Sequence, residues 1–272
     1  MTLRLAIVVA LSLAASTSAF AQRWIDKPDG WVNRPAQPPD APISPAEHSC
    51  RWGKTVQAQI RGCTGLIARS RDPHVQAQAL DLRGLAESAA HRWELAVADF
   101  NAANRLWPEF LGPYVDRAQL RLNRGDSTGA LSDYDQMIHA GANAPGFDLA
   151  VGYDGRCWVR ALANVDLDDA MADCNTAQRL DPRDSVTYSD RALVWLRKGE
   201  ASRAIEDADF ALGLDSSNVE ALYFRALAQR TLDHFSDAGA DMAAAARQDS
   251  TGEIAFLRRW GIGSSVSPAS TP

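Results

Sequence analysis

A short pattern of residues recurs along this 272-residue chain at a spacing of 34. Each copy has an arginine followed by a small residue, then an alanine, and then an aspartate three residues after the alanine. Because chance does not hold one register over five copies, the chain is predicted to be an array of like units. Copies begin at Arg83, Arg117, Arg191 and Arg225, and a partial copy surrounds Ala170 and Asp173.

Each unit has the pattern of two helices. In Tyr188–Leu196 and Ala204–Leu214, apolar or small residues recur at steps of three and four, which indicates helices rather than strands. The polar break Arg197–Glu200 contains Gly199, where a tight turn is expected. A single helical hairpin cannot bury its apolar face, so neighbouring copies are expected to stack on one another.

The period and pattern resemble those of the tetratricopeptide repeat family, with a small residue at position eight, a small one at position twenty and a bulky one at position twenty-four. The resemblance covers about Ala46 to Trp260, with a degenerate first repeat and a capping helix at the end. It implies an all-α, right-handed superhelix, or solenoid, of helical hairpins. With repeats starting at Ala77, Leu111, Val151, Ser185 and Val219, the twentieth residues are Ala96, Ala130, Ala170, Ala204 and Ala238.

The predicted organisation follows from this register. The full repeats are residues 77–110, 111–144, 151–184, 185–218 and 219–252, after a degenerate repeat at 46–73. A signal peptide (1–21) and a proline-rich linker (22–45) come first, and a capping helix (253–260) and a disordered tail (261–272) come last. Between Asp133 and Asp173 the spacing is six residues longer than the period, which places an insertion near Ala144–Ala150.

The first 21 residues have the features of a secretory signal. Arg4 supplies a positive start, Leu5–Ala15 is a compact apolar run, and Ala19–Ala21 is a small-x-small cleavage site. The alternatives are a membrane anchor or a buried helix. A periplasmic or secreted bacterial protein is therefore expected, and no later stretch is long and apolar enough to span a bilayer.

The four cysteines suggest disulfides, because the count is even in a chain expected to be exported. Four cysteines allow three pairings. In the repeat numbering, Cys157 falls at position seven and Cys174 at position twenty-four, which lie on facing helices in the resembled family. This register favours Cys157–Cys174 and Cys50–Cys63. A redox-active pair is the alternative reading, but it lacks CxxC spacing.

Arginine at position seven accompanies aspartate at position twenty-three in four repeats. A ladder of ion pairs is one hypothesis for the pairs Arg83/Asp99, Arg117/Asp133, Arg191/Asp207 and Arg225/Asp241. An exposed pair would contribute only about 0–1 kcal/mol. Burying a side chain such as Phe100 contributes about 1.5–3 kcal/mol, so packing is expected to hold the array together.

No recognised catalytic motif is present in the sequence: there is no nucleophile elbow, phosphate-binding loop, dinucleotide fingerprint or zinc-protease motif. Cofactors and metal ligands are accordingly not expected, and the protein is predicted not to be an enzyme. The net charge of −6 does not indicate a nucleic-acid-binding surface.

A binding groove is the remaining candidate. In the resembled family the first helices of successive repeats line a concave surface, which implies a partner protein or peptide held there. The alternatives are that the leucines only pack against the adjoining helix, that the stripe self-associates into a homo-oligomer, or that the protein is redox-active or enzymatic. The residues carried over are Leu85, Val115, Gln119, Val159, Leu162, Leu193, Leu196, Arg197, Tyr223, Leu227 and Arg230.

The repeat at Val151 departs from the pattern. Trp158 falls at position eight, where the family has a small residue. A bulky side chain there is expected to push the two helices apart or to force repacking.

Overall fold

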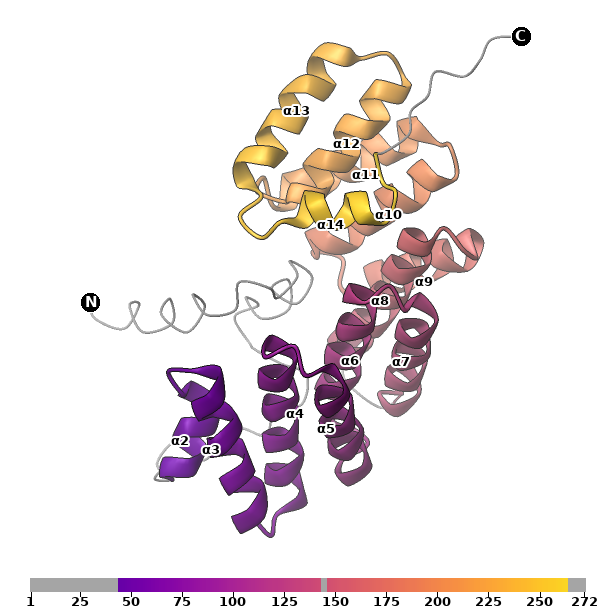
Figure 1. Ribbon diagram of the computed structural model, residues 1–272. Coiled ribbons are helices and arrows are strands. Elements are labelled where there is room, and N and C mark those ends of the chain that lie inside the picture. Colours follow the sequence, from indigo (N-terminus) through magenta and orange to yellow (C-terminus); the bar gives the residue numbers. More distant parts are fainter. Residues whose placement is uncertain (1–43, 143–145, 264–272) are drawn as a thin grey trace, which may run out of the picture. The chain divides into compact units, whose positions relative to one another are not determined.

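The computed structural model describes residues 44–142 and 146–263, and all regular structure within them is helical (Figure 1). The predicted signal peptide, nearly all of the linker and the tail beyond residue 263 lie outside the described residues. The predicted all-α fold of paired helices is confirmed. The helices are α2 (Pro45–Trp52), α3 (Val56–Arg69), α4 (Pro73–Ala89), α5 (Trp93–Leu106), α6 (Gly112–Asn123), α7 (Ser127–Ala140), α8 (Gly146–Ala163), α9 (Leu167–Leu180), α10 (Ser185–Arg197), α11 (Ala201–Leu214), α12 (Val219–Thr231), α13 (Phe235–Gln248) and α14 (Glu253–Arg259).

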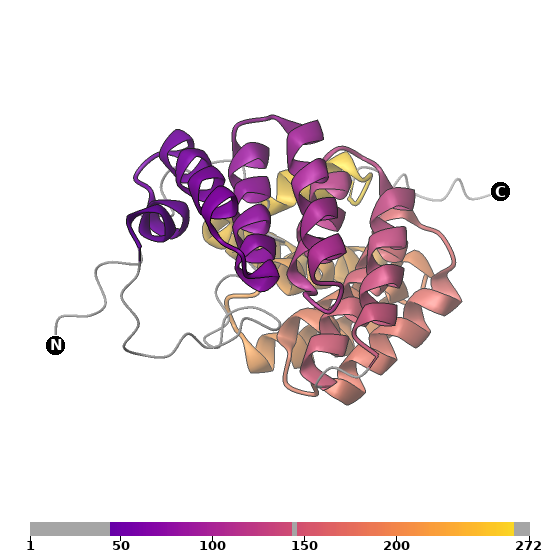
Figure 2. The ribbon, with the colours of Figure 1, turned by 90° about the horizontal axis from the view of Figure 1, so that it is seen from below.

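The chain forms two compact units. Unit 1 holds α2 to α6, and each of these helices packs on the next, as Figures 1 and 2 show. Unit 2 holds most of α7 together with α8 to α14. Its hairpins are α8/α9, α10/α11 and α12/α13, and the first helices α8, α10 and α12 also contact one another in turn. Neighbouring hairpins therefore share the apolar faces that none could bury alone.

The turn inside each hairpin repeats with the sequence. Gly199 has a φ of +80°, as expected for the residue that reverses the chain after α10. Residues at the same register, including Gly125 and Asp233, also have positive φ. Between hairpins, polar side chains start the helices: Asp184 accepts a bond from the Val186 amide and Asn218 one from the Ala221 amide.

Each hairpin core pairs a small residue with a large one. A Cβ added to Gly84 would lie 2.7 Å from Cε1 of Phe100, which is fully buried. Position eight must therefore be small because position twenty-four fills the space beside it. Burying an aromatic ring such as this one contributes about 1.5–3 kcal/mol to stability.

The structure corrects the register of the repeat at Val151. Arg156, and not Cys157, makes the paired contact with Asp173 that the other arginines make in their hairpins. Cys157 therefore stands at position eight, facing Cys174 at position twenty-four. The assignment of Trp158 to position eight is wrong: it belongs to the next position, so the separation or repacking of helices expected from position eight does not apply to it. Trp158 is fully buried, with its ring 6.4 Å from that of Phe224.

The shift arises from one extra residue before α9. Arg156 and Asp173 are 17 residues apart, whereas Arg191 and Asp207 are 16 apart. The longer turn contains two left-handed residues, Asn164 and Asp166. These residue types tolerate that conformation better than most others, which allows the extra residue without glycine.

Helix α14 folds back onto the last hairpin. The carboxylate of Asp249 accepts bonds from the amides of Gly252, Glu253 and Ile254 at 2.8, 2.7 and 3.1 Å, and Gly252 has a φ of +83°. After this tight turn α14 packs on α12 (Figure 1). Residues 261–263, assigned from the sequence to the tail, instead form a turn in which Ile262 is buried.

Candidate functional site: the first-helix face of unit 2

Unit 2 carries one face on which side chains from different hairpins meet a separate segment of the chain. We define this first-helix face by Arg197 of α10 and by Tyr223 and Leu227 of α12. The segment that lies on it is residues 253–263, which we call the C-terminal segment. The two are far apart in sequence, so their contact is tertiary.

Arg197 connects the ends of two helices. Its Nε donates to the carbonyl oxygen of Ala161 at 3.1 Å, and its Nη2 donates to Leu162 at 3.1 Å and to Trp260 at 3.3 Å. The first two acceptors lie in the last turn of α8, and Trp260 is the C-cap of α14. A cation is favourable there because the last carbonyls of a helix lack partners within the helix and carry its negative end.

Burial affects the charge of Arg197. Removal from water lowers the pKa of its guanidinium below the ordinary value. Among the described residues, its hydrogen-bond acceptors are backbone carbonyls, which are neutral dipoles, and not carboxylates. The group is thus placed to recognise peptide backbone.

Tyr223 and Leu227 contact the next part of the C-terminal segment. The hydroxyl of Tyr223 donates to the carbonyl oxygen of Ile262 at 3.2 Å. A Cβ added to Gly263 would lie 2.4 Å from that hydroxyl and 3.4 Å from Cδ2 of Leu227. Gly263 also has a φ of +80°, so glycine is required there for both space and conformation.

The C-terminal segment contributes apolar side chains of its own. Ile254, Phe256, Leu257 and Ile262 are all buried, and Leu257 is fully buried. Ala255, on the same helix, is exposed. The segment is therefore held both by apolar burial and by side chains that bind its backbone.

The residues carried over as a groove are mostly not exposed. Leu85 packs beside the cluster of Ala96, Phe100 and Leu120, inside the core of unit 1. Leu196 and Arg197 are half-buried, and Arg230 is exposed. The buried members are Val115, Gln119, Val159, Leu162, Leu193, Tyr223 and Leu227.

Only part of that set comes together at one site. Arg197, Tyr223 and Leu227 meet at the C-terminal segment. Sequence reasoning missed Trp260 and Ile262, which supply the carbonyls. The signal available was the apolar spacing of Ile254, Leu257 and Trp260 followed by two glycines, which indicates a helix that ends on a packed turn.

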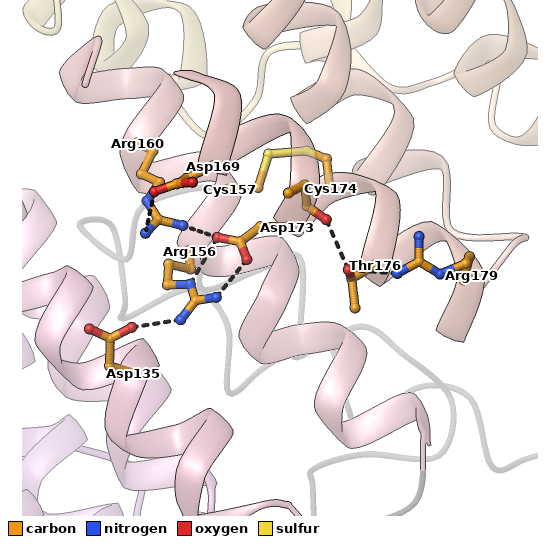
Figure 3. Close-up of polar contacts among 10 residues, drawn as sticks. Asp135, Arg156, Cys157, Arg160, Asp169, Asp173, Cys174, Thr176 and Arg179 are labelled. Atoms are coloured by element: carbon orange, nitrogen blue, oxygen red, sulfur yellow. Dashed lines mark hydrogen bonds and ion pairs between the residues drawn. A yellow bond between two sulfur atoms is a disulfide. The ribbon is translucent and has the colours of Figure 1, made fainter. Parts of the chain in front are cut away.

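The arginine–aspartate ladder is present inside the hairpins of both units. In Figure 3, Arg156 contacts Asp173 through Nε at 2.8 Å and Nη2 at 2.6 Å. The pairs Arg83/Asp99, Arg191/Asp207 and Arg225/Asp241 have the same two-bond geometry. Hydrogen bonds to the aspartates raise the pKa of Arg83, Arg156, Arg191 and Arg225. The residues of the Arg117/Asp133 pair belong to different units, and that pair stays a prediction.

These pairs are largely removed from solvent. The side chains of Asp99, Asp173, Asp207 and Asp241 are only 6–11% exposed. The small contribution expected of exposed pairs therefore does not apply to them. Removing one partner leaves the other partly buried without its counter-charge, which is costly.

Each of these arginines also reaches the preceding hairpin. Nη1 of Arg156 donates to Asp135 at 2.7 Å, and Nη1 of Arg225 donates to Asp209 at 2.6 Å. The acceptors share position twenty-five, which is polar in every repeat except the last, where it is Ala243, and this regularity is visible in the sequence. Arg117 makes the same kind of bond, so the five acceptors are Thr64 for Arg83, Asn101 for Arg117, Asp135 for Arg156, Asn175 for Arg191 and Asp209 for Arg225.

Both favoured disulfides are present in the structure. Cys157 and Cys174 join α8 to α9, with their Cα atoms 5.4 Å apart (Figure 3). Cys50 and Cys63 join α2 to α3, with their Cα atoms 4.4 Å apart. All four cysteines are fully or almost fully buried, so the bonds lie inside hairpins rather than at a reactive surface.

In residues 44–142 and 146–263, no group of three or more histidine, cysteine or acidic side chains is placed to hold a metal ion. Within the same ranges, no helix has the length and apolar character needed to cross a bilayer.

Comparison with known proteins identifies the fold. No protein-family profile matches the chain. A thermophilic tetratricopeptide repeat protein of Thermus thermophilus aligns with a TM-score of 0.54 and 21% identity, over 68% of this chain and 97% of that one. The BtubC protein of P. vanneervenii aligns with a TM-score of 0.60 and 13% identity, over 80% of this chain and 96% of its own. The hairpin array is thus the tetratricopeptide repeat fold.

Curated relatives match parts of the chain. Tetratricopeptide repeat protein 36 of Bos taurus is 34% identical over 105 residues, which are 39% of this chain and 55% of that protein. A tetratricopeptide-repeat-containing thioredoxin of Arabidopsis thaliana is 29% identical over 99 residues, which are 36% of this chain and 26% of that protein. The chain therefore spans less than two thirds of the length of these relatives.

Proposed function

We propose that this protein is a non-catalytic interaction scaffold that binds a segment of a partner protein through its first-helix face. The observation that carries the proposal is the contact of Arg197 and Tyr223 with the carbonyls of Trp260 and Ile262. Side chains from two successive first helices here bind peptide backbone. Backbone carbonyls are present in every protein segment, so a segment of another protein can make the same contact.

Paired charges support a structural rather than a catalytic role. The buried carboxylates of the ladder each bond an arginine of their own hairpin and recur at the repeat spacing, so they do not converge on one point. A catalytic pair instead requires two groups aimed at the same reacting atoms. The two disulfides close loops with separations of 13 and 17 residues and have no CxxC spacing, which supports a stabilising role.

We place this activity in the bacterial cell envelope. The support is the signal-like sequence at residues 1–21 together with two disulfides, which persist in oxidising compartments. A cytosolic chain would keep its thiols reduced.

Site-specific photo-crosslinking in the native cell tests the proposal. A photoreactive residue replaces Arg230, which is exposed on α12 beyond Leu227, or Asp237, which is exposed on α13. A partner adduct formed from position 230 and absent at position 237 is the expected result. Adducts formed at position 237 alone would contradict binding on the first-helix side.

Self-association is the second candidate function, and Phe235 favours it. Phe235 begins α13 and is 64% exposed, whereas Ala201, at the same register in α11, is 6% exposed. Helix α12 packs on α11 and follows it in the chain. Helix α14 follows α13 but packs on α12 and not along α13. Among the described helices, none packs along the outer side of α13, which leaves Phe235 available to a second copy.

Light scattering during size-exclusion chromatography separates the two candidates. A self-associating scaffold gives a molar mass that rises with concentration, and Phe235→Ser lowers it to that of the monomer. A monomer at every concentration would contradict this second candidate and leave the first unaffected.

A further inference from the structure

The C-terminal segment has the attributes of a bound peptide rather than of a further repeat helix. A next first helix would lie along α13, as α12 lies along α11, but α14 instead packs on α12. Its seven residues then lead into a turn whose carbonyls are bound by side chains of the first helices. The segment therefore uses the face proposed for the partner.

We propose that the C-terminal segment is an intramolecular ligand of the first-helix face, and that a partner binds by displacing it with a segment of the same chemistry. This inference rests on the proposed function. The segment defines the chemistry: a short helix with buried apolar side chains, ended by a turn that presents two backbone carbonyls.

Three contacts set the specificity of the face. Arg197 requires a helix C-terminus, because it already binds the last carbonyls of α8 and adds that of Trp260. Tyr223 requires a carbonyl two residues later, at Ile262. The close approach of Gly263 to Tyr223 and Leu227 requires a residue without a side chain. The expected partner segment is thus apolar and glycine-containing, and it ends a helix.

The turn that joins the C-terminal segment to α13 is short and is not part of the first-helix face. Only the turn at Asp249–Gly252 connects α14 to α13, and its bonds are local. Displacement therefore does not require any hairpin to unfold. The C-terminal segment competes with an outside peptide for the face. The apparent affinity for that peptide is therefore its intrinsic affinity multiplied by the fraction of molecules whose face is free.

A labelled peptide with the sequence of residues 253–263 provides the test, titrated into the full chain by fluorescence anisotropy. Leu257→Asp places a charge at a fully buried position of α14 and is expected to release the segment. Ala255→Asp adds the same charge on the exposed side of the same helix and is the matched control. Circular dichroism and hydrogen exchange over residues 254–263 accompany each titration.

We expect the peptide to bind Leu257→Asp at least about tenfold more tightly than it binds the natural chain or Ala255→Asp. Faster exchange over residues 254–263, with the hairpins still folded, should accompany that gain. Release without a gain in affinity would overturn the inference, and so would unchanged protection of the segment in Leu257→Asp. A natural chain that is dimeric and that the peptide makes monomeric would overturn the intramolecular assignment. Photo-crosslinking at position 230 tests the proposed function separately. It detects a bound partner whether or not the C-terminal segment covers the face before the partner binds.

Discussion

Asp207 accepts bonds from Arg191 at 2.8 and 2.6 Å and from the indole nitrogen of Trp195 at 2.9 Å, so one carboxylate joins α10 to α11 through three donors. Asp209, two residues later, is more than half exposed, and it accepts a bond from Arg225. The two residues are nearly adjacent in sequence but lie in different surroundings.

These surroundings predict unequal effects on stability. Asp207→Ala is expected to lower the free energy of unfolding by about 2–3 kcal/mol, because it leaves buried charged donors without an acceptor. Asp209→Ala is expected to cost about 0–1 kcal/mol, as for other exposed ion pairs. Chemical denaturation of both variants checks this, and equal losses would contradict the burial of the ladder.

Removing the Cys157–Cys174 bond is expected to cost about 2–4 kcal/mol. The bond joins residues that are 17 apart in sequence and so lowers the conformational entropy of the unfolded chain, which is the main source of its contribution to stability. The variant Cys157→Ala/Cys174→Ala is the suitable one, because the neighbouring repeat has Ala192 and Ala208 at the same two positions. Denaturation of this variant under oxidising conditions, with Cys50–Cys63 intact, measures the loss. Unchanged stability would show that the bond is absent or without effect.

The Lys198–Asp168 contact predicts a change at acidic pH. The hydrogen bond from Lys198 lowers the pKa of Asp168 below its ordinary value, which is near 4. A lowered carboxyl pKa in the folded state contributes stability above the unfolded-state pKa, and that contribution is lost as the pH falls through the folded-state value. In Lys198→Gln the pKa of Asp168, followed by carbon NMR, is expected to rise back toward its ordinary value, because the hydrogen bond from Lys198 is lost. Lys198→Arg, which keeps the charge, should preserve the shift, and no difference between the two variants would contradict the contact.

Export predicts a defined mature chain. If residues 1–21 are a signal peptide, the purified envelope protein begins at Gln22. Intact-mass measurement of protein from fractionated cells checks this. A charged substitution, Ala21→Arg, should block cleavage and leave the longer chain. Recovery of the natural protein in the cytosol with Met1 still present would contradict the envelope assignment.

The repeat was predictable because packing imposes it on the sequence. Position eight must be small beside a bulky position twenty-four, as Gly84 is beside Phe100, and the turn after the first helix needs a left-handed residue such as Gly199. Both constraints leave residue types that recur every 34 positions. The same regularity led to the disulfide pairings that the structure contains.

The register at Cys157 was not predictable by counting. One extra residue before α9 moved the arginine to Arg156 and Trp158 to the following position, and only the contact with Asp173 reveals the shift. A fixed period assigns positions by distance along the chain, whereas helices align by contact. The Asn164 and Asp166 turn absorbs the difference without disturbing the hairpin.

The site itself was predictable only in part. Family positions pointed to Arg197, Tyr223 and Leu227, because the first helices line a concave surface in the resembled family. What they contact depends on the direction in which the chain leaves α13, and that direction is set by the bonds of Asp249 to three amides. A sequence pattern indicates that 253–260 is helical but does not show on which neighbouring helix it packs.

The central claim is that the first helices α10 and α12 bind peptide segments and that a partner competes there with the C-terminal segment. Hydrogen exchange of the natural chain, alone and with the partner isolated by crosslinking, tests this most directly. The account predicts that amides of residues 254–263 are protected in the free chain and exchange faster in the complex, while α10 and α12 stay protected. Unchanged protection of residues 254–263 in the complex, with new protection confined to α11 and α13, would contradict it.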